Sequence, residues 1–161
     1  MLWVGLDVMA NHMLYHVPNQ EQALREMRRV LKPGGRVVMA TNAVDHGQRF
    51  RELQAEVACE QGFTPSSSIA GRFTLDDLPL VQRVFANAER HVVHNAFVFP
   101  TAGPALAYYS SSLVDAITER EEDGGHRAKL LPVMEARIQA IIERDGEFRV
   151  PKAAGCFVAS V

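Results

Sequence analysis

The stretch that decides the fold runs from Leu6 to Asn42 and reads LDVMANHMLYHVPNQEQALREMRRVLKPGGRVVMATN. Residues 3–11 are nearly all apolar, as expected for a strand that is buried on both faces of a parallel sheet. A helix follows and ends at Pro33-Gly34-Gly35, after which Arg36 to Thr41 forms a second apolar strand. A strand, a helix and a strand in this order predict a right-handed parallel crossover.

The helix inside this stretch carries its own start signal. Asn19 follows Pro18 and can cap the helix, and Gln22 three residues later completes a capping box. Glu21 and Arg25 lie one turn apart and predict a favourable ion pair. One apolar face recurs at helical spacing and consists of Ala23, Leu24, Met27, Val30 and Leu31.

This strand, helix and strand resemble the second half of the nucleotide-binding sheet in class I S-adenosylmethionine (SAM)-dependent methyltransferases. The closest resemblance is to the type 11 branch, which is related to ubiquinone-biosynthesis enzymes. The residues that match the family's strand four, helix D and strand five are Asp7, Asn11, His12, Leu14, His16, Glu26, Arg29, Val30, Leu31, Lys32, Pro33, Gly34 and Gly35. In the family this stretch lies in the middle of the chain, whereas here it starts at residue 6.

The family's glycine-rich loop after strand one is absent from this sequence. Only glycine lets the backbone approach the methionyl part of SAM there. The glycine pairs of this chain are Gly34-Gly35 and Gly124-Gly125, and neither follows a strand and opens a helix. We therefore expect a truncated chain, the C-terminal half of the methyltransferase fold. One piece of a split enzyme and a half that dimerises are the alternatives.

Further elements are expected beyond residue 42. A helix is expected from Asp45 to Gln61, with Phe50, Leu53 and Val57 facing inward, and another is capped by Thr74 through a Thr-x-x-Asp pattern. Pro79 should kink the first turns of that helix. The remaining elements are a strand from His91 to Phe99, a helical pair over 104–145 that Gly124-Gly125 separates, and a final strand from Phe148 to Val161, with possible breaks near Pro151 and Gly155.

The resemblance implies an α/β fold in which residues 1–161 form a single domain with a partial Rossmann-like methyltransferase sheet. The strand order is then four, five, seven, six, with the seventh strand antiparallel and with helices on both faces. Residues 104–145 form a helical insertion between the last two strands, which resembles a cap. Strand four, at Leu6 to Asn11, would be an unpaired apolar edge, and such edges recruit partners. The expected partner is a second copy, giving a homodimer, or the missing N-terminal half.

Candidate cofactor residues follow the first strand. Asn11, His12 and Met13 lie at its carboxyl end, where open α/β sheets bind ligands. By resemblance, they flank the adenosine and sulfonium parts of SAM, whereas the simpler alternative is that they satisfy backbone groups in a turn. His12 and His16 are four residues apart and could share a helical face, and either is a candidate general base.

Two tyrosines are candidates for a substrate pocket. Tyr108 and Tyr109 either line such a pocket or pack under the cap, and the sequence does not distinguish these roles. No metal site is expected: Met13 stands where a zincin helix needs glutamate. His91 and His94, three apart in a strand, point to opposite faces and cannot share a metal.

Composition describes an ordinary globular protein. The chain has 161 residues, 47% hydrophobic and 22% charged, with a net charge of −2 and a pI near 6.3. A nucleic-acid partner would favour a strongly basic face, which this balance does not predict. Cys59 and Cys156 form no metal or disulfide pattern, so we expect both to be reduced and buried in a cytoplasmic protein. No apolar run reaches the roughly 18 residues needed to span a bilayer.

The function that the resemblance implies is methyl transfer from SAM to a small-molecule acceptor. Because the sulfonium is a good leaving group, catalysis needs in-line positioning and a dry pocket rather than a fixed triad. The absent glycine loop favours an alternative, a non-catalytic half-domain that acts as a dimerisation or interaction module. A different doubly wound enzyme, such as a reductase, is a third alternative, and the lack of a GxGxxG motif counts against it.

Overall fold

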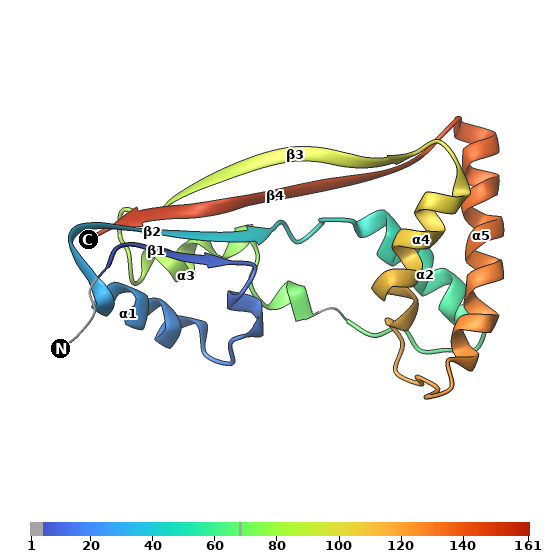
Figure 1. Cartoon of the computed structure of the whole chain (residues 1–161), viewed down its shortest axis with the longest axis horizontal. Helices are drawn as coiled ribbons and strands as arrows, with labels where there is room; N and C mark the ends of the chain where they lie inside the picture. The colour runs from blue at the N-terminus through green and yellow to red at the C-terminus, as the bar shows by residue number, and fades with distance from the viewer. Residues whose placement is uncertain (1–4, 68) are drawn as a thin grey trace. The chain divides into compact units, whose positions relative to one another are not determined.

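The structure is a computed structural model that describes residues 5–67 and 69–161. Its strands are β1 Gly5–Asn11, β2 Leu31–Asn42, β3 Glu89–Phe99 and β4 Phe148–Ser160 (Figure 1). Its helices are α1 Gln20–Val30, α2 Gln48–Glu60, α3 Leu78–Gln82, α4 Ala102–Ser112 and α5 Gly125–Asp145. Single 3-10 turns are η1 Leu14–His16, η2 Ile69–Arg72, η3 Leu75–Asp77 and η4 Leu113–Asp115. Residues 3 and 4 of the predicted first strand lie outside the described residues.

Contacts divide the chain into two compact units. Unit 1 consists of residues 1–46, 69–94 and 153–161, and unit 2 of residues 47–68 and 95–152. The predicted insertion over 104–145 lies in unit 2, between β3 and β4 along the chain. The predicted single domain stays a prediction.

The sheet has the predicted strand order. Its order is β1-β2-β4-β3, which corresponds to the family's strands four, five, seven and six. β1 and β2 are parallel, with Asn11 opposite Ala40. β2 and β4 are antiparallel, with Met39 opposite Phe157, so the prediction that the seventh strand is reversed is confirmed. The predicted α/β fold is therefore the observed one.

One face of this sheet is covered within unit 1. Alternate residues of β2 and β4 are fully buried, including Val37, Met39 and Phe157. They pack in one apolar cluster with Leu24 of α1 and Val81 of α3. Figure 1 shows α1 and α3 on the same side of the sheet, and the two helices contact each other. The helical spacing of apolar residues in α1 thus serves to cover this face.

The opposite face of the sheet is open among the described residues of unit 1. Met9 of β1 is 66% exposed, and Val38 and Val158 in the next two strands are half-buried. No residue that the register places on this face is buried; the set is Asp7, Met9, Asn11, Arg36, Val38, Ala40, Asn42, Ala154, Cys156, Val158 and Ser160. The expectation of helices on both faces is not met in unit 1, because both of its α-helices cover one face.

Helix α1 has the predicted N-cap at Asn19, but among the described residues only one of the two hydrogen bonds of the predicted capping box is present. The side chain of Asn19 accepts a hydrogen bond from the backbone N–H of Gln22 at 2.9 Å. Glu21 and Arg25 form the predicted ion pair at 2.7 Å. The helix ends at Val30, and the strand register then skips from Leu31 opposite Gly5 to Arg36 opposite Asp7.

The glycine pair Gly34-Gly35 allows the skip in strand register between Leu31 and Arg36. Gly34 has a φ of 79°, in the left-handed region that favours glycine. A Cβ on Gly35 would lie 2.8 Å from the carbonyl oxygen of Lys32, so the chain is too close for a side chain there. The role of this turn is therefore structural, as its place between a helix and a strand predicts.

Two expectations about prolines are corrected. Thr74 forms the predicted capping box with Asp77, but on the 3-10 turn η3 rather than on an α-helix. α3 starts only at Leu78, so Pro79 lies in its first turn, where the missing N–H costs nothing. β4 continues without a break through Pro151 and Gly155.

The predicted burial of the cysteines is wrong for Cys59. Cys59 is exposed on α2, and Cys156 is half-buried on β4; both are free thiols. In α2 the residues predicted to face inward, Phe50, Leu53 and Val57, are indeed buried. Cys59 lies two residues beyond Val57 and so on another side of the helix.

Unit 2 is built from helices around an aromatic cluster. In α5 one apolar stripe faces inward, with Leu130, Met134 and Ile138 fully buried. Phe50 packs edge to face on Phe148, with ring centroids 4.9 Å apart. In the described part of the chain, no helix has both the length and the apolar character needed to cross a membrane.

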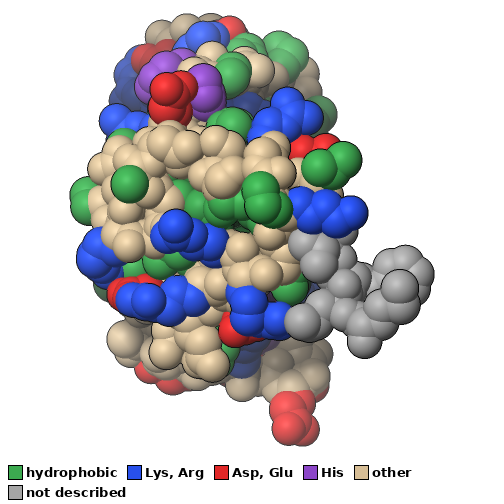
Figure 2. All heavy atoms as spheres, turned by 90° about the vertical axis from the view of Figure 1, so that its left-hand side faces the viewer, with side chains coloured by type: hydrophobic (Ala, Val, Ile, Leu, Met, Phe, Trp, Pro, Cys, Tyr) green, Lys and Arg blue, Asp and Glu red, His purple; other side chains and the backbone are tan. Residues whose placement is uncertain are grey.

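Charged side chains are distributed in groups on the surface. Figure 2, which views the end where α1 lies in Figure 1, shows separate groups of Lys and Arg side chains with hydrophobic ones between them. On α1, Arg25 pairs with Glu21 and Arg29 pairs with Glu26, each at 2.7 Å. Part of the basic charge on this helix is therefore balanced by neighbouring carboxylates.

Candidate functional site

The candidate site lies at the carboxyl end of β1. Asn11, His12 and Met13 are all exposed there. His12 has a φ of 52°, and among the described residues no other non-glycine residue has a positive φ. Its backbone N–H donates a hydrogen bond of 2.9 Å to the carbonyl oxygen of Ala40 in β2. Left-handed non-glycine residues are uncommon and concentrate at functional sites, because the surrounding structure must hold them in place.

The chain after these residues is anchored by a buried leucine. Leu14 is 2% exposed and packs in the apolar cluster beneath the sheet. The backbone N–H of His16 donates a hydrogen bond of 3.0 Å to the carbonyl of Met13, which closes the turn. The segment also contacts η2. The main chain is thus fixed while the three side chains before Leu14 stay exposed.

The two candidate histidines do not share a helical face. His16 ends the single 3-10 turn η1 and His12 precedes that turn, so the expected helical arrangement is wrong. Both rings instead contact Tyr15, with centroids 4.6 Å away for His16 and 6.4 Å away for His12. Sequence reasoning missed Tyr15, although an aromatic residue between two histidines is a visible signal. Tyr15 thus contacts both imidazole rings.

The exposed side chains of this segment offer both polar and apolar contacts. The amide of Asn11 and the imidazole of His12 can form hydrogen bonds. Met13 is 55% exposed, and its thioether offers apolar contact. The glycine loop that would hold the methionyl part is absent from the sequence. A role of this segment in cofactor binding stays a prediction.

The two candidate substrate tyrosines lie in unit 2 and differ in exposure. Tyr109 is fully buried, and its hydroxyl donates a hydrogen bond to the side-chain oxygen of Gln54. Burial, together with the nearby charge of Asp115, raises the pKa of Tyr109 well above its usual value. Tyr108 is 39% exposed and its ring packs on Phe97, with centroids 4.9 Å apart. The position of Tyr109 favours the packing role, whereas Tyr108 remains accessible to a ligand.

A charged cluster in unit 2 was not foreseen from the sequence. Asp115 accepts hydrogen bonds of 2.9 Å from His126 and from Arg127. The hydrogen bond from Arg127, with a further one from His126, lowers the pKa of Asp115 below its usual value. The other ring nitrogen of the buried His126 accepts the backbone N–H of Glu121 at 3.2 Å. Because both nitrogens have partners, this cluster orders the segment before α5 and offers no reactive group.

Metal ligation has no candidate cluster. Among residues 5–67 and 69–161, no group of three or more His, Cys, Asp or Glu side chains could hold a metal ion. His91 and His94 lie in β3, where both are exposed. In the sheet, β2 and β4 lie between β3 and β1.

Comparison with known proteins agrees with this fold. Residues 7–39 match a family model described as a methyltransferase domain. A candidate methyltransferase from Bacillus halodurans has a similar structure, with a TM-score of 0.50, 15% identity, and coverage of 98% of this chain and 64% of that one. A candidate methyltransferase of an antibiotic biosynthesis pathway from Anabaena variabilis gives a TM-score of 0.52, 18% identity, and coverage of 96% and 66%. No curated protein matches the chain.

These findings define the class of the fold. The chain spans less than two thirds of the length of either solved structure, and at such low identity the likeness shows the fold alone. The family match covers the strand, helix and strand that carry the resemblance in the sequence. The predicted resemblance to the class I methyltransferases is thus confirmed over residues 7–39.

Proposed function

We propose that this chain is the C-terminal half of a SAM-dependent methyltransferase that acts on a small-molecule acceptor. The observation that carries the proposal is the exposed segment Asn11 to Met13 at the carboxyl end of β1, with His12 held in a left-handed conformation. In a parallel α/β sheet this is the place where a ligand binds. Free cysteines are compatible with a cytoplasmic location, which is part of the same proposal.

Each residue of this segment has a proposed role. Asn11 and Met13 contact the cofactor, and SAM, when bound, supplies a methyl group on a good leaving group. His12 or His16 accepts the proton of an oxygen or nitrogen acceptor, and Tyr15 holds both rings in place through its contacts. In unit 2, exposed Tyr108 is the tyrosine proposed to contact a substrate, whereas Tyr109 is buried.

A second polypeptide segment is needed to complete the cofactor site. We propose that it carries the glycine-rich loop and pairs with the free edge of β1, from Leu6 to Asn11. Leu6 and Met9 on this strand are 63% and 66% exposed, which is unusual for large apolar side chains at a sheet edge. Whether that segment lies in the same protein or in a partner is part of the test.

The test is calorimetric titration of the chain with SAM and with its demethylated product, beside a mass measurement of its oligomeric state. We expect binding weaker than about 1 mM for the chain alone. Fusion of a family-like first half should lower the dissociation constant for SAM by at least about 100-fold. No gain from the fusion would contradict truncation, and micromolar binding by the chain alone would mean that this half builds a cofactor site by itself.

The role of the segment after β1 is tested within the fusion. His12→Ala should weaken SAM binding by about tenfold. His91→Ala is the matched control, because His91 is an exposed histidine of β3 and lies outside the proposed site. Equal effects of the two substitutions would remove the proposed role of His12.

The second candidate function is a non-catalytic interaction module. The same free β1 edge favours it, since an open apolar edge can pair with a second copy. A dimer in the mass measurement that Met9→Lys dissociates, together with no SAM binding by any fusion, would favour this function over catalysis. A monomer that gains SAM binding on fusion would favour the enzyme.

A further inference from the structure

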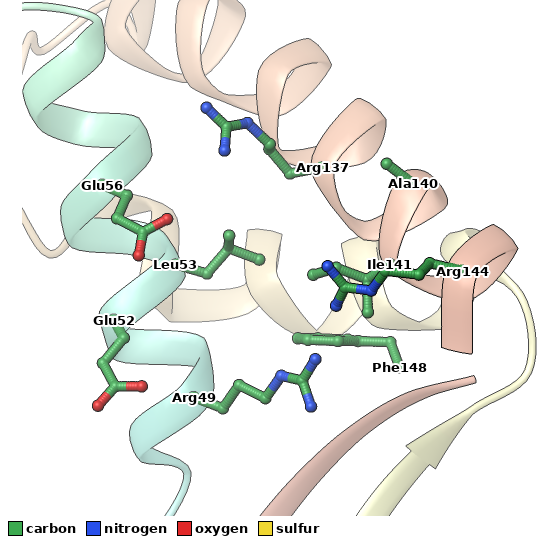
Figure 3. A pocket seen from close by; sticks show the side chains of 9 residues that line it. All are labelled: Arg49, Glu52, Leu53, Glu56, Arg137, Ala140, Ile141, Arg144 and Phe148. Carbon is green, nitrogen blue, oxygen red and sulfur yellow. The ribbon is translucent and has the colours of Figure 1, made fainter. Parts of the chain in front are cut away.

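The groove between α2 and α5 in unit 2 offers little to a ligand (Figure 3). Its large apolar residues Leu53 and Phe148 are only 8% and 0% exposed. The guanidinium groups of Arg49 and Arg144 both pair with the carboxylate of Asp145. A surface with accessible apolar side chains lies instead on the sheet, at β3.

The outer edge of β3 is open. This strand lies at one end of the order β1-β2-β4-β3, so among the described residues β4 is its one neighbour in the sheet (Figure 1). β3 has 11 residues, whereas a strand commonly has about five or six. Residues 89–95 are all exposed. A long exposed edge strand presents a row of backbone groups with which another strand can pair.

The exposed part of β3 is apolar at its middle. Val92 is 38% exposed and Val93 is 68% exposed, and because successive side chains point to opposite faces, each face has one exposed valine. Arg90 is directed to its own chain, where it donates to the carbonyl of Leu75 at 3.0 Å and lies 3.5 Å from Asp76. β3 contains no lysine and no proline, which are the residues that commonly block pairing at an edge.

The backbone of β3 shows which residues face outward. The carbonyl of His91 lies so close to Gly155 of β4 that a Cβ on this glycine would overlap it. In an antiparallel strand the N–H and C=O of one residue point to the same side, and those of the next residue point to the other side. The backbone groups of Arg90, Val92 and His94 are therefore directed away from β4.

The open stretch of this edge ends at Ala96. By the same alternation the N–H of Ala96 is directed outward, but it already donates a hydrogen bond of 2.8 Å to the side-chain oxygen of Asn95. Residues 90–94 thus form the open stretch, and Val92 is its middle residue.

We propose that residues 90–94 pair with the same residues of a second copy of this chain, antiparallel and with Val92 opposite Val92 of the second copy. A two-fold axis through this pair makes the interface self-complementary. Arg90 then lies opposite His94 of the second copy, and no two guanidinium groups or carboxylates lie opposite each other. Parallel pairing in register would place the two Arg90 side chains next to each other, which is unfavourable.

This pairing is independent of the proposed cofactor segment, which follows β1 at the other end of the sheet order. So short a pairing buries less surface than a standard interface does. We therefore expect a weak dimer, with a dissociation constant of about 0.1–1 mM.

The first test is sedimentation equilibrium of the full chain from about 10 µM to about 1 mM. Val92→Lys brings two ammonium groups together at the two-fold axis and should weaken dimerisation at least about tenfold. Met9→Lys is the matched control, because it adds the same charge to an exposed apolar residue of β1, at the opposite edge, and should change nothing. Circular dichroism checks that both variants fold.

Three results of this experiment would overturn the proposal. They are a monomer at every concentration, an equal loss in the two variants, and a loss in Met9→Lys alone. The last result would place self-association at the β1 edge instead.

A cross-link tests the register. In a chain with Cys59→Ser and Cys156→Ser, Val92→Cys should give a disulfide-linked dimer on mild oxidation, because Cα atoms of opposite residues lie about 5.5 Å apart, within reach of a disulfide. Glu89→Cys is the control: its side chain is also exposed, but the two copies of position 89 would lie about 20 Å apart along the strands. Non-reducing electrophoresis should show at least about tenfold more cross-linked dimer for Val92→Cys. Equal yields, or none for Val92→Cys, would contradict this pairing.

Discussion

The two faces of the sheet in unit 1 differ in burial, although both are apolar at their centre. On the covered face, Met39 and Phe157 are fully buried. On the open face, Met9 is 66% exposed and Val38 and Val158 are half-buried, although the same strands supply both faces. An antiparallel sheet with one solvated face normally alternates apolar and polar residues. Here the open face follows that rule only at its ends, where Asp7, Arg36 and Asn42 lie, whereas its centre is apolar.

On the open face, exposure and composition do not match, because its centre is apolar although it is not buried. The centre of the open face consists of small or apolar side chains, among them Ala40, Cys156 and Val158. Small side chains permit close approach by a covering layer. We therefore expect that the segment proposed to pair with the edge of β1 also covers this face.

The largest expected effect comes from removing an aromatic ring on the covered face. Phe157 is fully buried and packs edge to face on Phe73, with centroids 5.8 Å apart. Phe157→Ala should lower the free energy of unfolding by about 3–5 kcal/mol, since it leaves a cavity. Val158→Ala, one residue further on the open face, should cost at most about 1 kcal/mol. Urea unfolding measures both, and similar losses would contradict the difference between the faces.

A hydroxyl on the covered face should give the next largest effect. Thr41 is 1% exposed and donates a hydrogen bond of 2.8 Å to the carbonyl of Phe73. Thr41→Val keeps the shape but leaves that carbonyl without its donor, so a loss of about 1–2 kcal/mol is expected in urea unfolding. Asn42→Val, the neighbouring change on the open face, should stay within about 0.5 kcal/mol. A neutral Thr41→Val would mean that the hydrogen bond is replaced by water.

The sheet of unit 1 was predictable because its signals are local. The cap at Asn19, the apolar spacing of α1 and the glycine turn at Gly34 lie within a few residues of the elements they define. Pro79 was misread because the Thr74 capping box belongs to a 3-10 turn, and α3 begins only after it. The strand order followed from the resemblance rather than from spacing.

The candidate site was only partly predictable. The position of Asn11 to Met13 after β1 followed from the end of an apolar strand. The left-handed conformation of His12 depends on its hydrogen bond to Ala40, a contact between strands that no local pattern shows. The pairing of Asp115 with His126 joins residues on either side of a turn, so single-sequence spacing could not reveal it.

The open face also makes a prediction about thiol reactivity. Cys156 is half-buried on this face, and Cys59 is exposed on α2. Cys59 therefore serves as an internal control for the reactivity of Cys156. Alkylation by iodoacetamide should modify both cysteines in the native chain, as mass spectrometry of the peptides would show. Fusion of a family-like first half should lower the alkylation rate of Cys156 by about tenfold and leave the rate of Cys59 unchanged. An unchanged Cys156 rate in a fusion that binds SAM would mean that the added half leaves this face open.

The smallest effect is expected from the ion pair at the free edge. Asp7 of β1 and Arg36 of β2 lie opposite each other on the open face, with a separation of 3.1 Å, and their side chains are 57% and 68% exposed. Exposed pairs contribute little because water and salt screen them, so Asp7→Asn should lower stability by at most about 0.5 kcal/mol in urea unfolding. That loss should vanish at roughly 1 M salt. If the added half covers this face in the fusion, Asp7→Asn should lower the stability of the fusion by more, because water screens a buried ion pair less. An equal, salt-sensitive loss in both proteins would show that the edge at Asp7 stays in water.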